Sequence, residues 1–285
     1  MVADSNSIFS SPDLITRGGR TLYACPFASL GMEDNGKGRA PGLAICYNQK
    51  LQTDSTGTSM CGRFVLMTVG RDLAQHLGLK EDIELEPRYN IAPMQVVAIV
   101  RNEESGGRRE LRLVKWGLIP FWAKDPKIAS RLINARAESV AEKPAFRAAF
   151  KNRPCLVPAD GFYEWKKTKG KKQPYFFGLA NGKPLAFAGL WERWKAPDGD
   201  IIESCTILTT DANELLEPIH DRMPVIVKPE DYDLWLDPKM KKPELVKPLL
   251  QPFPPDQMAG YLVSEKVNKA GHEGPELVRS IDSEP

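Results

Sequence analysis

The run Met60-Cys61-Gly62-Arg63 holds the residue with the most distinctive chemistry in this chain. If Cys61 is the first residue of the working protein, it carries a free α-amine and a free thiol together. An aldehyde condenses with such an amine, and the thiol then closes a five-membered thiazolidine ring. The ordinary pKa values, about 8 for the amine and about 8.5 for the thiol, leave both groups reactive near neutral pH. An internal Cys61 has a planar amide nitrogen instead, so this chemistry requires Cys61 at the amino terminus.

Four further polar residues stand where a strand or turn has no need of them. They are Asn134 and Arg136 in one short motif, Glu164 among aromatic residues, and His220 just before an apolar run. Each also has a purely structural explanation. Asn134 suits a turn, Arg136 a solvated surface, and Glu164 the exposed side of an alternating strand. His220 suits the carboxyl end of a helix, where positive charge is favourable.

Together with the cysteine, these residues belong to six ordered motifs that span about 160 residues. The motifs are Cys61-Gly62-Arg63-Phe64, Arg88-Tyr89-Asn90-Ile91-Ala92-Pro93, Trp116-Gly117-Leu118-Ile119-Pro120, Ile133-Asn134-Ala135-Arg136-Ala137-Glu138, Gly161-Phe162-Tyr163-Glu164-Trp165 and Ile219-His220-Asp221-Arg222-Met223-Pro224. In these motifs the chain resembles the SOS-response-associated peptidase family, whose members crosslink to abasic sites in single-stranded DNA. The resemblance runs from Cys61 to about Leu277. It departs from the family in the 59 residues that precede Cys61, because the family works with its cysteine at the mature amino terminus.

The resemblance implies a catalytic set of Cys61, Asn134, Glu164 and His220, with no cofactor and no metal. The amine of Cys61 would attack C1′ of the open-chain sugar to give a Schiff base, which the thiol closes. Glu164, held among aromatic rings, would have a raised pKa and move protons between the reacting groups. His220 would protonate the sugar ring oxygen as it opens. Asn134 would position the cysteine or a sugar hydroxyl.

A second set of residues is expected to bind the DNA. Planar guanidinium groups suit phosphate, so Arg63 and Arg136 would hold the phosphates beside the lesion. The resemblance makes Pro93 and Trp122 a wedge against the neighbouring bases, and it assigns Asn90 to DNA binding as well. Two alternatives stay open at the wedge: Trp122 can be an ordinary half-buried indole, or the neighbouring Phe121 can fill the role. A lysine-rich turn, residues 166–173, either touches the DNA backbone or is a solvated hairpin tip.

The composition limits which functional classes of protein this chain can belong to. The 285 residues include 42% hydrophobic residues, enough for a full core, and the formal net charge is only +2. A nucleic acid would therefore be held by local basic groups rather than by bulk charge. No run approaches the roughly 18 apolar residues of a membrane span. The five cysteines and three histidines show no metal-ligand spacing, and Cys155 and Cys205 lie in apolar runs that suit buried thiols.

The apolar pattern predicts an α+β domain with a barrel-like antiparallel or mixed sheet and peripheral helices. Helices are expected at 71–79, 138–150, 213–219 and 229–236. Strands are expected at 96–101, 111–116, 153–158, 161–166, 175–179, 186–192, 204–209 and 225–227. The last ten or so residues are expected to fray. Residues 60–280 are expected to form one domain.

Residues 1–59 are rich in Ser, Gly, Asn and Thr and lack sustained apolar periodicity. We expect this leader to be disordered, to be cleaved, or to lie upstream of a true start at Met60. An organellar transit peptide is the alternative, although Asp4, Asp13, Glu33 and Asp34 are atypical of one. Removal of Met60 by ordinary processing would expose Cys61. Autoproteolysis assisted by Glu164 and His220 would do the same.

The expected function is that of an abasic-site sensor, which protects the lesion through a covalent thiazolidine crosslink and later reverses it. The alternative is a non-covalent reader of modified or single-stranded DNA. The expected partners are single-stranded DNA containing abasic sites and junctions of single- and double-stranded DNA, without a membrane. We expect a monomer in the cytoplasm, associated with the nucleoid in a bacterium or within the nucleus in a eukaryote.

Overall fold

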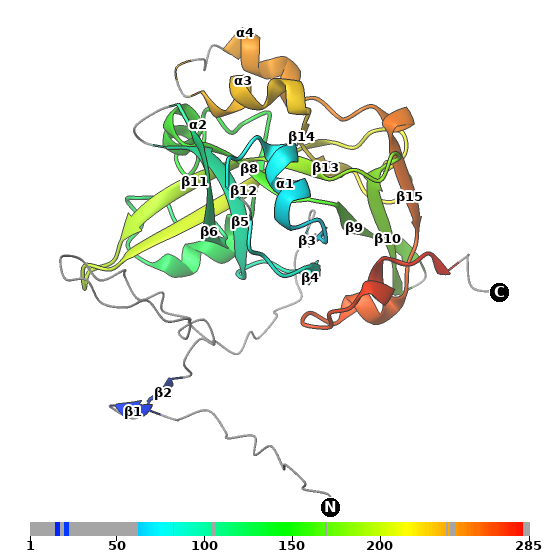
Figure 1. Ribbon diagram of the computed structural model, residues 1–285, viewed down its shortest axis with the longest axis horizontal. Coiled ribbons are helices and arrows are strands. Elements are labelled where there is room, and N and C mark those ends of the chain that lie inside the picture. The colour runs from blue at the N-terminus through cyan, green and yellow to red at the C-terminus, as the bar shows by residue number, and fades with distance from the viewer. Residues whose placement is uncertain are drawn as a thin grey trace, which may run out of the picture. The chain divides into compact units, whose positions relative to one another are not determined.

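The computed structural model describes residues 15–17, 20–22, 62–81, 83–103, 107–168, 170–237, 239 and 243–281 (Figure 1). Its contacts divide the chain into two units, Met1–Gly57 and Thr58–Pro285. In the first unit, β1 (Ile15–Arg17) and β2 (Arg20–Leu22) pair as an antiparallel ribbon. The expectation for residues 1–59 otherwise falls outside the described residues, and so does the placement of Cys61.

The centre of the second unit is a closed barrel of five strands. Its members are β5 (Val96–Asn102), β6 (Arg109–Trp116), β8 (Pro154–Ala159), β11 (Leu185–Lys195) and β12 (Ile201–Asp211). β12 pairs with β11 on one side and with β6 on the other, which closes the ring. The β12–β6 pair is parallel and the other four pairs are antiparallel. Closure leaves the ring without free edges. The predicted α+β fold with a barrel-like mixed sheet is therefore confirmed.

A second, antiparallel sheet packs beside the barrel. Its strand order is β15 (Met258–Leu262), β10 (Lys171–Leu179), β9 (Gly161–Thr168), β3 (Arg63–Leu66) and β4 (Arg88–Ile91). The two sheets share one aromatic core. Phe64 of β3 meets Trp116 of β6 with ring centroids 5.3 Å apart, and it meets Phe187 of β11 at 5.8 Å. The cysteine motif therefore begins a strand that is fixed against the barrel.

Three short strands extend the barrel around β12 and β11. β7 (Asn134–Arg136) pairs with β12 in parallel, and β13 (Arg222–Pro224) pairs with β12 antiparallel. β14 (Ile226–Val227) pairs antiparallel with β11. Trp116 anchors the approach to β7, because its indole nitrogen donates to the carbonyl of Ile133 at 2.8 Å. β12 thus lies between the motif that contains Asn134 and the motif that contains His220.

Helices are few and lie at the periphery, as expected. They are α1 (Gly70–Leu77), α2 (Arg147–Asn152), α3 (Tyr232–Leu236) and α4 (Pro243–Val246). Single turns of 3₁₀ helix occur at η1 (Pro126–Arg131), η2 (Pro229–Asp231), η4 (Lys247–Leu250), η5 (Pro255–Gln257), η6 (Glu265–Asn268) and η7 (Pro275–Val278). α1 ends at Gly78, whose φ of 66° is the left-handed conformation that glycine adopts at a helix end.

Three sequence predictions need correction. The helix expected at 138–150 forms only over 147–152, because Pro144 cannot donate a backbone hydrogen bond within it. The segment 213–219 makes one turn, in which Glu217 donates to the carbonyl of Asn213, and it does not continue as a helix. The carboxyl-terminal residues up to 281 are not frayed: Leu277 is fully buried, and Val263 pairs with Ser280.

Two other features of the described residues bear on the sequence analysis. Cys155 and Cys205 are fully buried, as expected, and burial raises the pKa of the Cys205 thiol. None of the helices in the described part of the chain is both long enough and apolar enough to cross a membrane.

Candidate active site

A small, partly open cavity lies where the sequence motifs meet. Its lining comes from both sheets, and it has room for about one water molecule at most. The residues that line it are Arg63, Phe64, Trp116, Phe162, Phe187, Ile207 and Pro224. Four of the six motifs supply lining residues. A fifth motif adjoins the cavity, because Asn134 is the register partner of Ile207. Segments up to 160 residues apart in sequence are therefore brought to one place.

Glu164 lies on β9, with its side chain on the same strand face as Phe162. It is only 1% exposed, so the exposed-strand explanation is wrong. β3 and β9 are antiparallel, with Arg63 opposite Tyr163 and Phe64 opposite Phe162. Continuing that register by one residue sets Gly62 opposite Glu164. The carboxylate is therefore buried beside the residue that directly follows Cys61.

Asn134 and Arg136 share one face of β7, next to β12. Asn134 is the register partner of Ile207, and Arg136 is the partner of Thr209. Paired residues in a sheet point to the same side, so Asn134 lies on the face of β12 that borders the cavity. Asn134 is half-buried, whereas Arg136 is exposed and available to a ligand. The two residues therefore combine an inner polar group with an outer positive charge.

His220 follows the turn at 213–219 and is half-buried. Its Nδ1 accepts a hydrogen bond from the backbone N–H of Arg222 at 3.1 Å and lies 3.2 Å from Asp221 Oδ1. The carbonyl oxygen of Arg222 also lies 3.3 Å from Nδ1, so all of these contacts are made by the same ring nitrogen. Of the residues that the structure describes, none forms a hydrogen bond with Nε2. The backbone N–H of His220 also closes the preceding turn on the carbonyl of Leu216, so His220 ends a turn and not the helix expected there.

Arg222 is a structural residue of this site to which the sequence reasoning gave no role. Its guanidinium is buried and donates to both carboxylate oxygens of Glu138, at 2.9 and 3.0 Å, to Asp211 and to the carbonyl of Thr209. Burial by itself would lower the pKa of Arg222, but Glu138 and Asp211 raise it above the ordinary value. Arg222 thus fastens β13 to β12 and to the segment after β7. The sequence did offer one indication of this role, because Arg222 stands between His220 and an apolar strand.

Arg63 and Asn90 form a pair on the neighbouring strands β3 and β4. Arg63 Nη1 donates to Asn90 Oδ1 at 2.7 Å and to the carbonyl of Val267 at 2.9 Å. Asn90 is fully buried, and its Nδ2 donates to the carbonyls of Val267, Lys269 and His272. The assignment of Asn90 to direct DNA contact is therefore wrong for this structure, because every polar atom of its side chain is engaged within the protein.

The expected wedge residues lie in two neighbouring loops. Pro93 is half-buried and begins a turn that Gln95 closes on the carbonyl of Ala92. Phe121 is 56% exposed and Trp122 is 49% exposed, whereas Ala123, the next residue, accepts a hydrogen bond from Trp194 at 2.7 Å. Both aromatic rings are open to a stacking partner, and exposure alone does not separate them.

Comparison with known proteins decides the family. The sequence signature of "SOS response associated peptidase (SRAP)" matches residues 60–270 of this chain. This chain belongs to the SRAP family.

Similar proteins come from bacteria and eukaryotes. An abasic site processing protein of Bacillus subtilis, YoqW, is 44% identical over 225 residues, which cover 78% of this chain and all of that protein. The abasic site processing protein YedK of Escherichia coli is 31% identical, over 78% of this chain and all of YedK. A crystal structure of a Bacteroides thetaiotaomicron protein matches with a TM-score of 0.70 and 28% identity, over 77% of this chain and 99% of that one. These SRAP-sized proteins thus match this chain along essentially their whole length.

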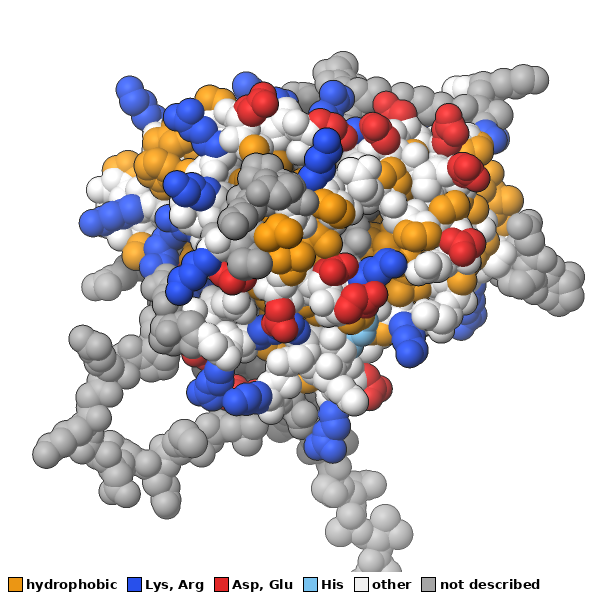
Figure 2. All heavy atoms as spheres, turned by 90° about the horizontal axis from the view of Figure 1, so that it is seen from above, with side chains coloured by type: hydrophobic (Ala, Val, Ile, Leu, Met, Phe, Trp, Pro, Cys, Tyr) orange, Lys and Arg blue, Asp and Glu red, His pale blue; other side chains and the backbone are white. Residues whose placement is uncertain are grey.

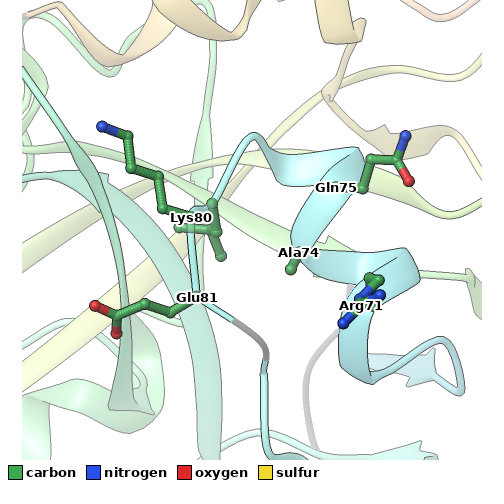
Figure 3. Close-up of a pocket in the computed structure, with 6 residues that line it drawn as sticks. Arg71, Ala74, Gln75, Lys80 and Glu81 are labelled. Carbon is green, nitrogen blue, oxygen red and sulfur yellow. The ribbon is translucent and has the colours of Figure 1, made fainter.

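Another hollow in the described part of this SRAP chain lies elsewhere. It is open to solvent and lies between α1 and the segment that follows it (Figure 3). Arg71, Ala74 and Gln75 come from the helix, and Lys80 and Glu81 come from the segment that follows it. None of the six motifs contributes a lining residue. We therefore place the candidate site at the motif cluster and not in this hollow.

Surface charge in the SRAP unit agrees with the small net charge of the sequence. On the face drawn in Figure 2, basic and acidic side chains are interspersed. A polyanion would therefore be held by individual groups such as Arg63 and Arg136. The lysine-rich turn forms the tip of the β9–β10 hairpin, where Gly170 has a φ of 84°.

Proposed function

We propose that this protein senses abasic sites in single-stranded DNA and captures them covalently through Cys61. The α-amine adds to the C1′ aldehyde of the open sugar, and loss of water from the carbinolamine gives an imine. The thiol then adds to the imine carbon, and its proton passes to the nitrogen. One water molecule is released overall, and the product is a thiazolidine.

The observation that carries this proposal is the position of Glu164. Its carboxylate is buried in the register position opposite Gly62, and a peptide bond keeps the Cα of Cys61 about 3.8 Å from that of Gly62. A carboxylate so close to a terminal amine can accept its proton and return it to the leaving hydroxyl. A chain that only bound DNA would have no need of a buried acid at that point.

His220 and Asn134 supply the other polar groups. The contacts of the His220 ring with described residues are all made by Nδ1, which leaves Nε2 for a sugar oxygen during ring opening and during reversal of the adduct. Asn134, on the cavity-bordering face of β7, would hold the cysteine or a sugar hydroxyl. The positions of both side chains depend on β12, because β7, which contains Asn134, and β13, which follows His220, both pair with it.

DNA binding is assigned to Arg63, Arg136, Pro93 and the aromatic pair Phe121 and Trp122. The two arginines would hold phosphates on either side of the lesion. Pro93 with Trp122 or Phe121 would stack on the adjacent base, which gives affinity without base readout. This arrangement suits single-stranded DNA and junctions with duplex.

Cys61 must be exposed before it can react. We propose that translation from Met60 followed by removal of methionine produces the active form, because cysteine is small enough for ordinary amino-terminal processing. Cleavage of residues 1–60 by the chain itself, with Glu164 and His220 assisting, is the second route. In either case the working unit is the single domain expected over residues 60–280, without Met60, and it acts as a monomer on DNA in the bacterial cytoplasm or the eukaryotic nucleus.

Denaturing electrophoresis tests the proposal. Protein that begins at Cys61 is mixed with a single-stranded oligonucleotide containing one abasic site, and intact DNA of the same sequence is the control. We expect a heat-stable shifted band that Cys61→Ala abolishes. A complex that is sensitive to salt and vanishes on denaturation would instead indicate a non-covalent reader.

The start of the chain needs its own measurement. The full 285-residue chain is expressed, and its intact mass is compared with that of the Glu164→Gln and His220→Gln variants. Loss of residues 1–60 that depends on these side chains would indicate autoproteolysis. Loss that is independent of them would indicate ordinary processing or initiation at Met60.

A further inference from the structure

The carboxyl-terminal segment 263–281, here called the C-terminal clasp, lies against the outer face of the second sheet. Figure 1 shows the end of the chain beside β10 and β15. Val263, Val267 and Leu277 are fully buried and pack around Val65 and Tyr163 of that sheet. The clasp is therefore an integral layer of the fold on the side where Arg63 lies.

Asn90 is the point at which the clasp joins the sheet. Its amide nitrogen donates to three clasp carbonyls, those of Lys269 at 3.1 Å, His272 at 3.0 Å and Val267 at 3.3 Å. Its amide oxygen accepts from Arg63 at 2.7 Å. One side chain thus joins the clasp to Arg63, and it has no polar atom left for another partner.

Two further bonds hold the clasp near the same place. The indole nitrogen of Trp165 donates to Asn268 Oδ1 at 2.6 Å, and the Arg63 guanidinium lies 5.9 Å from the Trp165 ring centroid. The backbone N–H of Tyr89 donates to Glu273 at 2.7 Å. The residues around Arg63 are therefore held in place by hydrogen bonds to the clasp.

The partners of Arg63 are all neutral. Arg222 and Arg101 are each paired with two carboxylates. Among the described residues, by contrast, no carboxylate forms an ion pair with Arg63. Burial lowers the pKa of Arg63, but a guanidinium keeps its proton in proteins. Within the described part of the chain, Arg63 is therefore a fixed cation without a carboxylate partner, two residues from Cys61 in sequence.

We propose that Asn90 and the C-terminal clasp are a positioning unit, which holds Nη1 of Arg63 so that its other donors face a DNA phosphate beside the lesion. This inference rests on the proposed function. Asn90 acts through Arg63 and touches no DNA, so its effect must vanish when Arg63 is absent. It must also appear in DNA affinity rather than in the rate of ring closure.

The test is single-turnover crosslinking with protein in excess, for Asn90→Asp, Arg63→Gln and the double variant. The readouts are the half-saturating protein concentration, the limiting rate and the salt dependence. Asn90→Asp keeps the side-chain shape, removes the donors to the clasp and gives Arg63 a carboxylate partner. We expect the half-saturating concentration to rise about tenfold, as for loss of one charge-assisted hydrogen bond. The limiting rate should stay within about twofold.

The double variant shows whether Asn90 acts through Arg63 or whether its substitution causes a general structural defect. The double variant should bind DNA no more weakly than Arg63→Gln alone. All three variants should lose about 0.7 from the slope of log affinity against log salt, the value for one phosphate contact on single-stranded DNA. In Asn90→Asp, adduct formation between Cys61 and glycolaldehyde, a probe without phosphate, should proceed at the parent rate. Asn102→Asp is the matched control, because Asn102 also donates to a backbone carbonyl, that of Leu236, but far from Arg63.

An unchanged affinity and salt slope in Asn90→Asp would overturn the inference, as would losses that multiply in the double variant. If Asn90→Asp does not fold, Asn268→Ala removes the exposed bonds of the clasp to Trp165 and to the carbonyl of Lys172, and it should give a smaller change of the same kind. If the parent protein forms no crosslink, the proposed function fails. Equilibrium binding to the same DNA then still measures the coupling between Asn90 and Arg63.

Discussion

Arg222 donates two parallel hydrogen bonds to Glu138, at 2.9 and 3.0 Å, and so joins the strand after His220 to the segment after Asn134. The two polar motifs of the candidate site are thus fixed relative to each other by a planar, bidentate pair. This pair stabilises the arrangement of the site without belonging to its chemistry, and its removal is expected to affect the fold first.

Arg222→Lys should destabilise the protein. Lysine keeps the charge but cannot make the two parallel bonds, and it leaves acceptors around a buried position unsatisfied. We expect a loss of about 1–3 kcal/mol in the free energy of unfolding, measured by urea denaturation. Arg136→Lys is the matched control on the exposed face of β7 and should stay within about 0.5 kcal/mol. Equal losses in the two variants would contradict this role of Arg222.

The same pair predicts a pH dependence of stability. Burial by itself would raise the pKa of Glu138, but hydrogen bonds and charge from Arg222 hold it below the ordinary value of 4.5. A carboxyl whose pKa is lower in the folded state contributes stability above its unfolded pKa and loses it as the pH falls. Stability should therefore decline as the pH drops below about 4.5, and Glu138→Gln should reduce that decline. Urea titrations between about pH 3 and pH 7 measure it, and an unchanged profile in Glu138→Gln would refute the assignment.

Glu164→Gln should slow crosslinking while leaving DNA binding intact. The amide has nearly the same shape but cannot take up the amine proton, and general-base catalysis contributes typically 10²- to 10⁴-fold. We expect the limiting rate of crosslinking to fall by a factor in that range, with the half-saturating concentration within about twofold. A rate equal to that of the parent would remove Glu164 from the mechanism.

The sequence patterns predicted most of the fold because the strands of the barrel carry long apolar runs. They did not predict β3, β4 or β15, which are only four or five residues long; β3 and β4 also mix polar with aromatic residues. Glu164 was singled out from its aromatic neighbours in the sequence, but its burial depends on how β3 and β9 pair. The role of Asn90 was out of reach, since its partners lie 177 to 182 residues further along the chain. Pro144, by contrast, was a visible signal against the helix expected at 138–150.

Substitution of the exposed aromatic residues should identify the wedge. Stacking of a base on an aromatic side chain is worth about 1–3 kcal/mol, or roughly 5- to 150-fold in affinity. We expect Trp122→Ala to weaken binding to abasic single-stranded DNA within that range, and Phe121→Ala to have the smaller effect. Fluorescence anisotropy with Cys61→Ala protein isolates this step from crosslinking. The reverse order would transfer the wedge role to Phe121, and no effect in either variant would remove the stacking step.

Mass spectrometry of the crosslinked peptide tests the central claim most directly. A protease digest of the DNA adduct should yield a peptide that begins at Cys61 and carries the sugar with loss of one water. Its sulfur should be inert to iodoacetamide, because nitrogen and sulfur both belong to the ring. An adduct at any other residue, or an active form in which Met60 still precedes Cys61, would contradict the account.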